Sequence, residues 1–204
     1  MSENLEALGE LTADQQALLL LMLRKKAQAR AEQRIPRVPR GGQQPLSFAQ
    51  ERLWFLNQFD PQSAYYNIPL ALRSHGPLNL AALESTLNEM MRRHEVLRTT
   101  FVENGGQPAQ HIHSDLKQDL PLVDLQGLAV NEQQEQAERL TREEARRPFD
   151  LGQAPLLRVN LLRLSDQQHQ FLFTMHHIVS DNWSMGVMVK EVVALYTAYQ
   201  GGAS

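Results

Sequence analysis

Residues 170–200 constrain the fold of this chain more than any other part. Gln170–Thr174 has the aromatic and β-forming residues of a buried strand, and Met185–Gln200 has an apolar-rich helical pattern that Gly201 and Gly202 would end. Between them lies a polar corner with two adjacent histidines and an aspartate. A strand and a helix hold such a corner rigidly, which makes it a suitable place to present reactive side chains.

Local signals predict the other elements. Ser47 and Gln50 form a capping-box pattern that begins a short apolar helix ending before Pro61, and Asn79 is placed to cap a second helix. An exposed helix is expected over Asn131–Arg147, supported by the acid-first pairs Glu135/Arg139, Glu138/Arg142 and Glu143/Arg147. Strands are expected at Tyr65–Ser74, Val96–Val102, Ala109–His113, Leu120–Leu125, Leu156–Leu164 and His169–His176, with hairpin turns at Asn104–Gly106 and Ser165–Gln168. This order predicts an α+β fold, a mixed α/β two-layer sandwich.

The segment before this sandwich has a different character. Residues 1–34 are expected to contain a helix over about Thr12–Ala31, acidic near its start and basic near its end, as the helix dipole favours. Its apolar run Ala17–Leu23 needs a cover, which is either its own domain or a partner protein onto which the helix docks. Residues 35–44 contain prolines and are typical of a linker, and residues 45–204 form the main domain.

Composition narrows the class of protein. The formal charge of −3 is modest, and the arginines of the linker lack interleaved aromatic residues, so we expect no nucleic-acid binding. There is no cysteine, which excludes disulfides and thiolate metal sites. The acidic N-terminus is unlike a secretory signal, and the longest apolar run is far shorter than a membrane span. We therefore expect a soluble, cytoplasmic protein that does not bind membranes.

The histidines at the corner allow several kinds of chemistry. If the strand continues through them, His176 and His177 point to opposite faces, so no shared metal ion is expected. Ser180, His177 and Asp181 are the components of a hydrolytic triad, but no Gly-x-Ser-x-Gly elbow surrounds the serine. A single histidine that accepts a proton from a nucleophile needs no second residue at the site, because the pKa of histidine lies near neutrality. From the residues alone, a structural histidine is the stronger interpretation and an acid/base site the weaker one.

Three segments taken together indicate a protein family more specifically than the histidine corner does alone. Met175–Ser184 closely resembles the His-His-x-x-x-Asp-Gly motif of the condensation domains of nonribosomal peptide synthetases, which also occurs in chloramphenicol acetyltransferase and related acyltransferases. Leu46–Leu56 resembles the first motif of these domains and Arg93–Phe101 the second. They occur in the family's order and at similar spacing, and Arg147–Leu151 is also similar. The resemblance runs from about Ile35 to the end of the chain.

This resemblance implies a fold and a reaction. The fold would be a chloramphenicol acetyltransferase-like lobe with a leading N-terminal helix. A full condensation domain resembles two such lobes with the active site between them, so this chain would be the N-terminal lobe, with little activity without the C-terminal lobe. Members join an acyl or peptidyl thioester to the amine of an aminoacyl thioester, a step in the biosynthesis of peptide antibiotics and other secondary metabolites.

The resemblance also implies partners. Both substrates are carried on the phosphopantetheine of donor and acceptor peptidyl carrier proteins, and the domain itself binds no cofactor and no metal. The helix within residues 1–34 would then be a docking element for an upstream synthetase subunit. Two alternatives are a free-standing lobe that acts as a carrier-protein binding or assembly module, and an acyltransferase of the same superfamily.

Roles follow for individual residues. His177 would hydrogen-bond or deprotonate the attacking amine, with His176 in support. Asp181 would be structural and pair with an arginine of the second motif, for which Arg98 is favoured because it lies on the expected strand. Ser184 would cap the following helix, whose first N–H groups would lie near the developing oxyanion.

Asn182 stands where the family has a glycine. Asparagine enters the left-handed region more readily than most residues, so we expect the turn to persist. The motif differs from the Asp-x-x-x-x-Asp form of heterocyclisation domains and from the Val-Ser-Trp pattern of epimerisation domains. The first motif resembles that of domains joining an L-aminoacyl donor to an L-aminoacyl acceptor, with starter domains that use fatty-acyl donors as the alternative.

Overall fold

The computed structural model describes Met22, Lys25 and residues 44–202. The chain divides into two compact units, Met1–Arg40 and Gly41–Ser204. Met22 and Lys25 are helical. The rest of the predicted helix Thr12–Ala31, and the predicted linker up to residue 43, lie outside the described residues.

The second unit contains both helices and strands, as predicted. Their order is β1 (Gln44–Pro45), α3 (Phe48–Phe59), β2 (Asn67–His75), α4 (Leu80–Arg93), the 3-10 helix η1 (Glu95–Arg98), β3 (Thr99–Asn104), β4 (Gln107–Ile112), β5 (Leu122–Asp124), α5 (Val130–Arg146), β6 (Leu157–Ser165), β7 (Gln168–His176) and α6 (Asn182–Gln200). The fold class is therefore the predicted mixture of helix and sheet.

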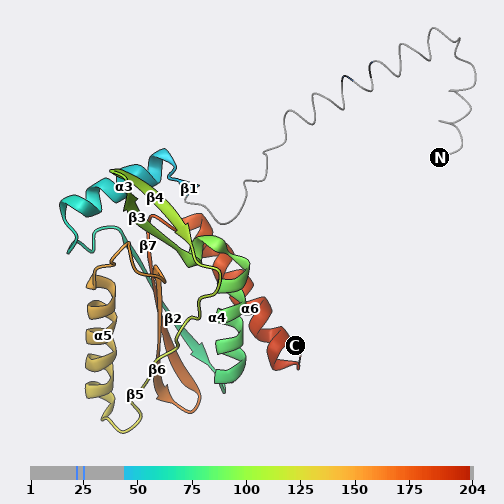
Figure 1. Ribbon diagram of the computed structural model, residues 1–204. Coiled ribbons are helices and arrows are strands. Elements are labelled where there is room, and N and C mark those ends of the chain that lie inside the picture. Colours follow the sequence, from blue (N-terminus) through green and yellow to red (C-terminus); the bar gives the residue numbers. More distant parts are fainter. Residues whose placement is uncertain (1–21, 23–24, 26–43, 203–204) are drawn as a thin grey trace, which may run out of the picture. The chain divides into compact units, whose positions relative to one another are not determined.

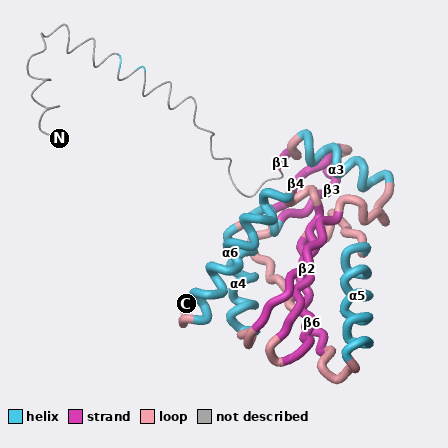
Figure 2. The backbone as a smooth tube through the Cα atoms, turned by 180° about the vertical axis from the view of Figure 1, so that it is seen from behind, coloured by secondary structure: helices cyan, strands magenta, loops and turns pink. Residues whose placement is uncertain are grey.

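A four-stranded sheet in the order β2–β7–β6–β5 forms the centre of this unit. Both neighbours of β7 pair with it antiparallel, whereas β5 runs parallel to β6. Helix α5 covers one face of the sheet, and α4 and α6 cover the other (Figures 1 and 2). Strand β7 is thus held by a strand on each side and by helices over both faces.

Side chains along β7 alternate between these two helix layers. Phe173 and Met175 belong to the core beneath α4 and α6, whereas Leu172 packs with Ala137 of α5. This alternation was predicted from the sequence. Because both faces are covered, the strand is apolar on both sides rather than on one.

A second, three-stranded sheet in the order β1–β4–β3 lies with α3 at the end of the large sheet where β7 finishes (Figure 1). Strands β3 and β4 form the predicted hairpin. Its turn residues Gly105 and Gly106 have φ angles of 60° and 80°. Two-residue hairpin turns of this kind need positive φ at both central positions, which glycine adopts without strain.

Both predicted helix caps are confirmed. The Ser47 hydroxyl accepts a hydrogen bond from the Gln50 N–H at 3.3 Å, and the Gln50 side-chain oxygen accepts one from the Ser47 N–H at 2.9 Å. The Asn79 side chain accepts a hydrogen bond from the N–H of Ala82 at 3.1 Å. Local chemistry therefore predicted the start of α3 and the start of α4 correctly.

Two local predictions are wrong in detail. The strand expected over Val96–Val102 begins only at Thr99, because the preceding residues form η1 and fold back towards α4. On α5, the pair Glu138–Arg142 forms at 3.6 Å, but the other two expected pairs do not. Arg139 instead contacts Glu143 at 2.7 Å, and Arg147 lies 4.0 Å from Glu144. Exposed pairs of this kind are worth little, so several partners compete on nearly equal terms.

The main core lies between the large sheet and helices α4 and α6. Leu83, Leu87 and Met91 of α4 are almost fully buried against Leu161 and Phe173 of the sheet. Among residues 44–202, no helix has both the length and the apolar composition required to cross a membrane.

Candidate functional site

The two histidines lie where β7 ends. His176 is the last residue of the strand and pairs with Asn67 of β2, and His177 begins the turn that leads to α6. The backbone N–H of His177 donates to the Tyr66 carbonyl at 2.8 Å, and that of Val179 donates to the His176 carbonyl at 3.1 Å. These bonds attach the turn to the edge strand on one side and to itself on the other, so its backbone is fixed.

His176 is a structural residue of this turn. Its imidazole is only 2 % exposed, and its Nδ1 accepts a hydrogen bond from the Ile178 N–H at 3.1 Å. The ring packs against Tyr66 and Phe149, with centroids 6.3 and 6.1 Å away. Burial lowers the pKa of His176 to about 4, and the neighbouring His177 adds to this effect. The imidazole is therefore neutral at pH 7, as its acceptor role requires.

His177 has the opposite environment. Its side chain is exposed. Within residues 44–202 its imidazole forms no hydrogen bond, so both ring nitrogens are open to a ligand. Adjacent residues with such different burial agree with the prediction that the two side chains face apart. A fixed backbone with a free imidazole would allow this side chain to act on a bound ligand.

Asp181 is the N-cap of α6. Its carboxylate accepts a hydrogen bond from the Ser184 N–H at 2.7 Å. Hydrogen bonds from Ser184 hold the pKa of this carboxyl below its usual value. The prediction that Ser184 caps the helix is therefore wrong, since the helix begins earlier, at Asn182. The expectation that the N–H groups of this first turn face an oxyanion also changes, because the Ser184 N–H is already bound to the cap.

Asn182 needs no special backbone conformation. It is the first residue of α6, and within residues 44–202 only glycines have positive φ. The left-handed turn expected at this position is therefore absent. An asparagine in place of glycine leaves the turn intact because the turn is helical here.

The predicted pairing of Arg98 with Asp181 does not form. Arg98 is buried in η1, and its guanidinium donates to backbone carbonyls, including those of Met91 at 2.7 Å and of His113. The pairing requires Arg98 to lie on a strand, but the strand begins one residue later. Arg98 instead links the end of α4 to the segment after β4. It supports the fold but does not touch the histidine turn.

The components of a hydrolytic triad are not arranged as a relay. The Ser180 hydroxyl donates to the Asp181 carbonyl at 3.4 Å and makes no contact with the imidazole of His177, so a Ser-His-Asp relay is not assembled. Within the described part of the chain, no three histidine or carboxylate side chains gather in a group that could hold a metal ion.

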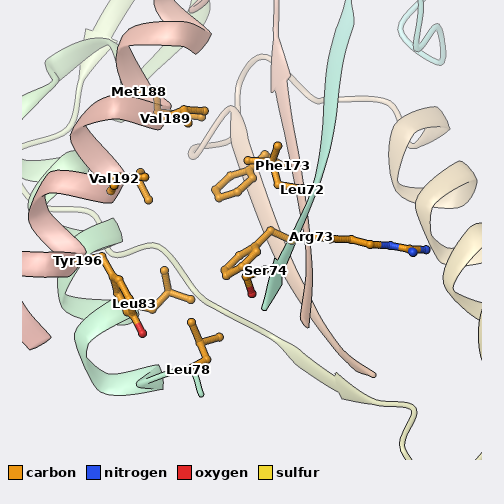
Figure 3. A pocket seen from close by; sticks show the side chains of 12 residues that line it. Leu72, Arg73, Ser74, Leu78, Leu83, Phe173, Met188, Val189, Val192 and Tyr196 are labelled. Atoms are coloured by element: carbon orange, nitrogen blue, oxygen red, sulfur yellow. The ribbon is translucent and has the colours of Figure 1, made fainter. Parts of the chain in front are cut away.

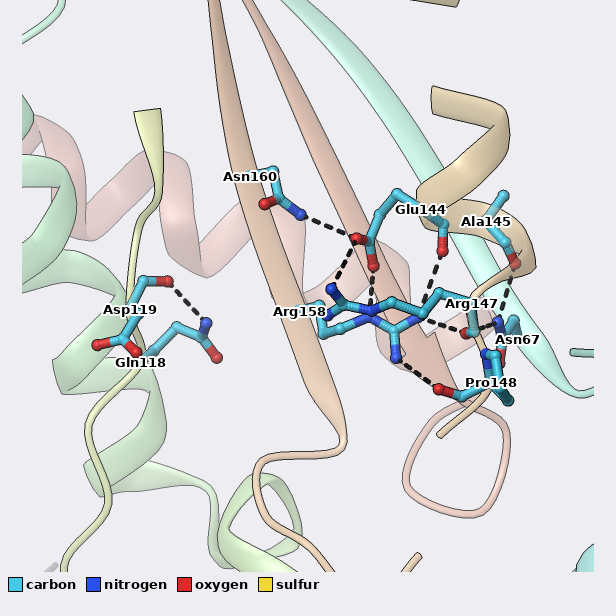
Figure 4. Close-up of polar contacts among 9 residues, drawn as sticks. All are labelled: Asn67, Gln118, Asp119, Glu144, Ala145, Arg147, Pro148, Arg158 and Asn160. Atoms are coloured by element: carbon cyan, nitrogen blue, oxygen red, sulfur yellow. Dashed lines mark hydrogen bonds and ion pairs between the residues drawn. The ribbon is translucent and has the colours of Figure 1, made fainter. Parts of the chain in front are cut away.

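A buried ion pair behind His176 was not predicted from the sequence. Arg158 of β6 binds the Glu144 carboxylate of α5, and Asn160 donates to the same carboxylate at 3.1 Å (Figure 4). The Arg158 guanidinium also donates to the Arg147 carbonyl at 2.7 Å and lies 3.7 Å above the Phe149 ring. Burial lowers the pKa of Arg158, and Glu144 opposes that shift.

This network positions the segment that follows α5. Asn67 of β2, the partner of His176 in the sheet, donates to the carbonyls of Ala145 and Arg147 at 2.8 and 2.9 Å (Figure 4). Together with Arg158 it holds Phe149 against His176. The similarity noted at Arg147–Leu151 was the only sequence signal for this region, and it did not identify the partners.

Helix α3 reaches the histidine turn through Gln50. The Gln50 amide donates to the Ile178 carbonyl at 3.4 Å, and its oxygen also accepts a hydrogen bond from Gln110 of β4 at 3.2 Å. The first and third motifs of the sequence are therefore in direct contact. One side chain joins α3, the small sheet and the histidine turn.

The outer face of α3 carries an aromatic stripe, defined by Phe48, Phe55 and Phe59. These residues are 92 %, 64 % and 86 % exposed, and their spacing places them on one side of the helix. The opposite side contributes Leu53 and Trp54 to the core. Large aromatic side chains so exposed are typical of surfaces that bind another protein.

Known proteins resemble this chain closely. A family model described as the condensation domain matches residues 41–204. A linear gramicidin synthase from Brevibacillus parabrevis is 50 % identical in one of its chains over 165 residues, which are 81 % of this chain and 2 % of that protein. Phosphinothricin tripeptide synthetase PhsC of Streptomyces viridochromogenes is 42 % identical over 196 residues, 96 % of this chain and 18 % of that protein.

Solved structures agree with these relatives. The starter condensation domain of rhizomide synthetase RzmA superposes with a TM-score of 0.74 at 26 % identity, covering 80 % of this chain and 41 % of that one. The first condensation domain of the calcium-dependent antibiotic synthetase gives a TM-score of 0.72 at 25 % identity, covering 80 % of this chain and 39 % of the other. The chain thus spans less than half of the solved domains, and a small fraction of each synthetase.

Proposed function

The chain belongs to the condensation-domain family, and on this basis we propose that residues 45–204 are the N-terminal catalytic lobe of a condensation domain that forms peptide bonds. The chloramphenicol acetyltransferase-like lobe expected from the sequence agrees with the fold of the solved domains. The observation that carries the proposal is the contrast within the motif. The His176 side chain is buried and its Nδ1 is hydrogen-bonded within the turn. The His177 side chain beside it is exposed on a backbone that hydrogen bonds hold in place.

In the proposed reaction, the α-amine of a carrier-bound aminoacyl thioester attacks the carbonyl of a carrier-bound acyl or peptidyl thioester. The new C–N bond forms as the C–S bond breaks, and the phosphopantetheine thiol of the donor carrier leaves with a proton. His177 accepts a hydrogen bond, or the proton itself, from the attacking amine, which cannot attack while protonated. His176 keeps the turn in place, and Asp181 fixes the start of α6 behind it.

The partners are a donor and an acceptor carrier protein, and we infer that one of them docks on the aromatic stripe of α3. Gln50, on the same helix, contacts the histidine turn, so a carrier at the stripe would lie near His177. Phosphopantetheine arrives as part of these substrates. The donor and acceptor are both L-aminoacyl groups, as the first motif suggests.

The site also requires a second lobe. His177 lines neither the cavity between α6 and the sheet nor the cavity beside Arg158. A bond-forming site needs walls that exclude water from the thioester. We therefore propose that these residues alone form one wall of the site and have little activity.

The test uses a completed domain, in which the corresponding C-terminal lobe from the matching gramicidin synthase chain follows this lobe. Amide formation between two loaded carrier proteins is measured for this domain and for its His177→Ala variant. We expect a loss of about 10²-fold or more. His75→Ala, at an exposed position at the other end of β2, is the matched control and should retain the full rate.

Two further outcomes bear on the proposal. Equal rates for His177→Ala and the unchanged domain would remove the assigned role. Rapid turnover by the 204-residue chain alone would contradict the need for a second lobe. The same assay with L- and D-aminoacyl donors tests the stereochemical preference, and the L-donor should react faster.

A further inference from the structure

A second pair of histidines, His111 and His113, belongs to the small sheet. His111 lies in β4, and His113 follows directly after the strand. No residue of β4 lines the apolar groove between α6 and the large sheet (Figure 3). The two histidines also lie outside the three motifs of the sequence, so the proposed reaction gives them no role.

The backbone places both side chains on one face of the small sheet. Residues two apart on extended chain project to the same side, and the extended pairing continues past β4, because the His113 N–H donates to the Arg98 carbonyl at 2.9 Å. The Arg98 guanidinium in turn donates to the His113 carbonyl. On the neighbouring strand β3, Thr100 pairs with His111 in register and therefore lies on the same face.

The imidazole rings of His111 and His113 are in contact and nearly perpendicular. Their centroids are 4.7 Å apart, and their planes meet at 86°. The lone pair of an imidazole nitrogen lies in the plane of its ring, so rings stacked in parallel planes cannot share an ion. Perpendicular planes intersect along a line, and an ion on that line lies in the plane of both rings.

The distance between the rings also suits a shared metal ion. A histidine nitrogen binds Zn²⁺ at about 2.0–2.1 Å, which places the ring centroid about 3.2 Å from the ion. Two such rings, at ligand–metal–ligand angles from about 90° to 109°, have centroids about 4.5–5.2 Å apart. The observed separation of 4.7 Å lies within this range. The pair therefore needs little rearrangement to bind an ion.

Thr100 prepares one nitrogen of His113 for binding. Its hydroxyl oxygen lies 3.1 Å from His113 Nε2 and 3.5 Å from the His111 carbonyl oxygen. Both contacts are satisfied when the hydroxyl donates its single proton to the carbonyl and accepts one from Nε2–H. Nδ1 of His113 is then unprotonated. Metal-binding histidines are commonly oriented in this way, by a hydrogen bond to the ring nitrogen that does not bind the metal.

Both imidazoles are available as ligands. Burial, together with the neighbouring His111, lowers the pKa of His113, so this ring is neutral at pH 7. His111 is exposed, and its ring forms no hydrogen bond within residues 44–202. An ion can thus reach the pair from solvent, and it meets the neutral form of His113 that metals bind.

We propose that His111 and His113 together bind a divalent transition-metal ion of the class that prefers imidazole, namely Zn²⁺, Ni²⁺ or Cu²⁺, with water at the remaining positions. Thr100 orients His113 towards the ion. Two protein ligands are fewer than the three or four of a resident metal site, so the ion exchanges with the solution and is not required for folding. Binding needs neither carrier proteins nor a second lobe, so it can be tested independently of the proposed reaction.

Titration calorimetry of the 204-residue chain, prepared without an affinity tag, tests the proposal with NiCl₂ at neutral pH. We expect one saturable site, whose affinity falls at least 10-fold in His111→Asn and in His113→Asn. His75→Asn, which alters an exposed histidine of β2, is the matched control and should bind like the unchanged chain. Equal binding by the control and by either variant of the pair overturns the proposal.

The unaltered chain provides a second test, which decides if His113→Asn does not fold. Zn²⁺ is diamagnetic, so the imidazole resonances of His111 and His113 can be followed by NMR during a titration with ZnCl₂. Both sets should shift together and level at the same metal concentration. Shifts in only one of the two rings, or shifts that do not saturate, contradict a shared ion.

A buried threonine tests the orientation of His113. Thr100→Val keeps the size of the side chain but removes the hydroxyl, and it should weaken Ni²⁺ binding about 10-fold. Thr99→Val is the matched control, because Thr99 is equally buried, projects to the other face of β3 and donates to the Glu95 carbonyl at 2.8 Å. It should bind Ni²⁺ normally. Undiminished binding by Thr100→Val would contradict the assigned role of Thr100.

Discussion

The carboxylate of Asp181 accepts a hydrogen bond from the backbone N–H of Ser184, 2.7 Å away, and so caps helix α6 immediately after the histidine turn. The aspartate of the motif therefore acts on the backbone of its own helix. It keeps the first turn of α6 in register with the end of β7. In the proposed reaction its contribution would be indirect, through the position of the residues before it.

Replacing Asp181 tests whether its carboxylate caps α6 or takes part in the reaction. Asp181→Ala removes the cap and should lower the midpoint temperature of thermal unfolding by a few degrees. Asp181→Asn keeps a capping oxygen and should lower this temperature much less. Circular dichroism melting curves at pH 7 give the comparison. If Asp181→Ala melts like the unchanged chain but the completed domain loses amide formation, the carboxylate takes part in the chemistry instead.

The buried His176 makes stability depend on pH. Its pKa is about 4 in the folded chain, against an ordinary value of 6.5, so the unfolded chain binds more protons as the pH falls through this range. The stabilisation is complete above about pH 6.5 and is lost progressively towards pH 4, by about 3 kcal/mol in total.

Urea unfolding at pH 7 and at pH 4.5 measures this loss. Other histidines also titrate, so His176→Asn is the control: its side-chain oxygen replaces Nδ1 as acceptor for the Ile178 N–H and does not titrate. The variant should lose clearly less stability between the two pH values. An equal loss in both proteins would show that His176 does not have the lowered pKa.

The ion pair between Arg158 and Glu144 should respond strongly to removal of one partner. Arg158→Met leaves a buried carboxylate without its cation and should cost about 3 kcal/mol of unfolding free energy. Arg163→Met, on the same strand but in an exposed pair with Asp166, is the matched control and should change stability little. Chemical denaturation measures both, and similar losses for the two variants would contradict a buried network.

The aromatic stripe predicts a change in binding without a change in stability. The double variant Phe55→Ser, Phe59→Ser should weaken carrier-protein affinity at least 10-fold in titration calorimetry, because these side chains are already exposed in the free chain. Val130→Ser, at an exposed position on α5, is the control and should bind normally. Normal binding by the double variant would place the carrier elsewhere.

Local chemistry explains why much of the fold could be predicted from the sequence. Ser47 and Asn79 cap helices through contacts with residues three positions away, and Gly105 and Gly106 adopt φ angles that few other residues tolerate. Such signals need no knowledge of the rest of the chain. The catalytic role of His177 stays a prediction, and only its resemblance to the motif together with the two other motifs raised it above a structural histidine.

The wrong predictions share a physical origin in tertiary contacts. The β-branched residues around Arg98 favour a strand, but its buried guanidinium binds the carbonyls at the end of α4, and the segment forms η1. In the sequence, Glu144 is one more acid on a polar helix. Its partner Arg158 lies on another element, so no spacing rule connects the two.

The contacts of Gln50 bear on how a tethered substrate reaches the imidazole. Its amide joins the helix of the aromatic stripe to the turn that carries His177, and Leu53 and Trp54 pack the same helix against the core. A carrier docked on the stripe, as proposed, would therefore lie at a fixed distance from the imidazole. A substrate on a flexible arm reaches its highest effective concentration when the arm length matches the span it must cover. In the proposed arrangement Gln50 would help to fix this span without contacting the reacting groups.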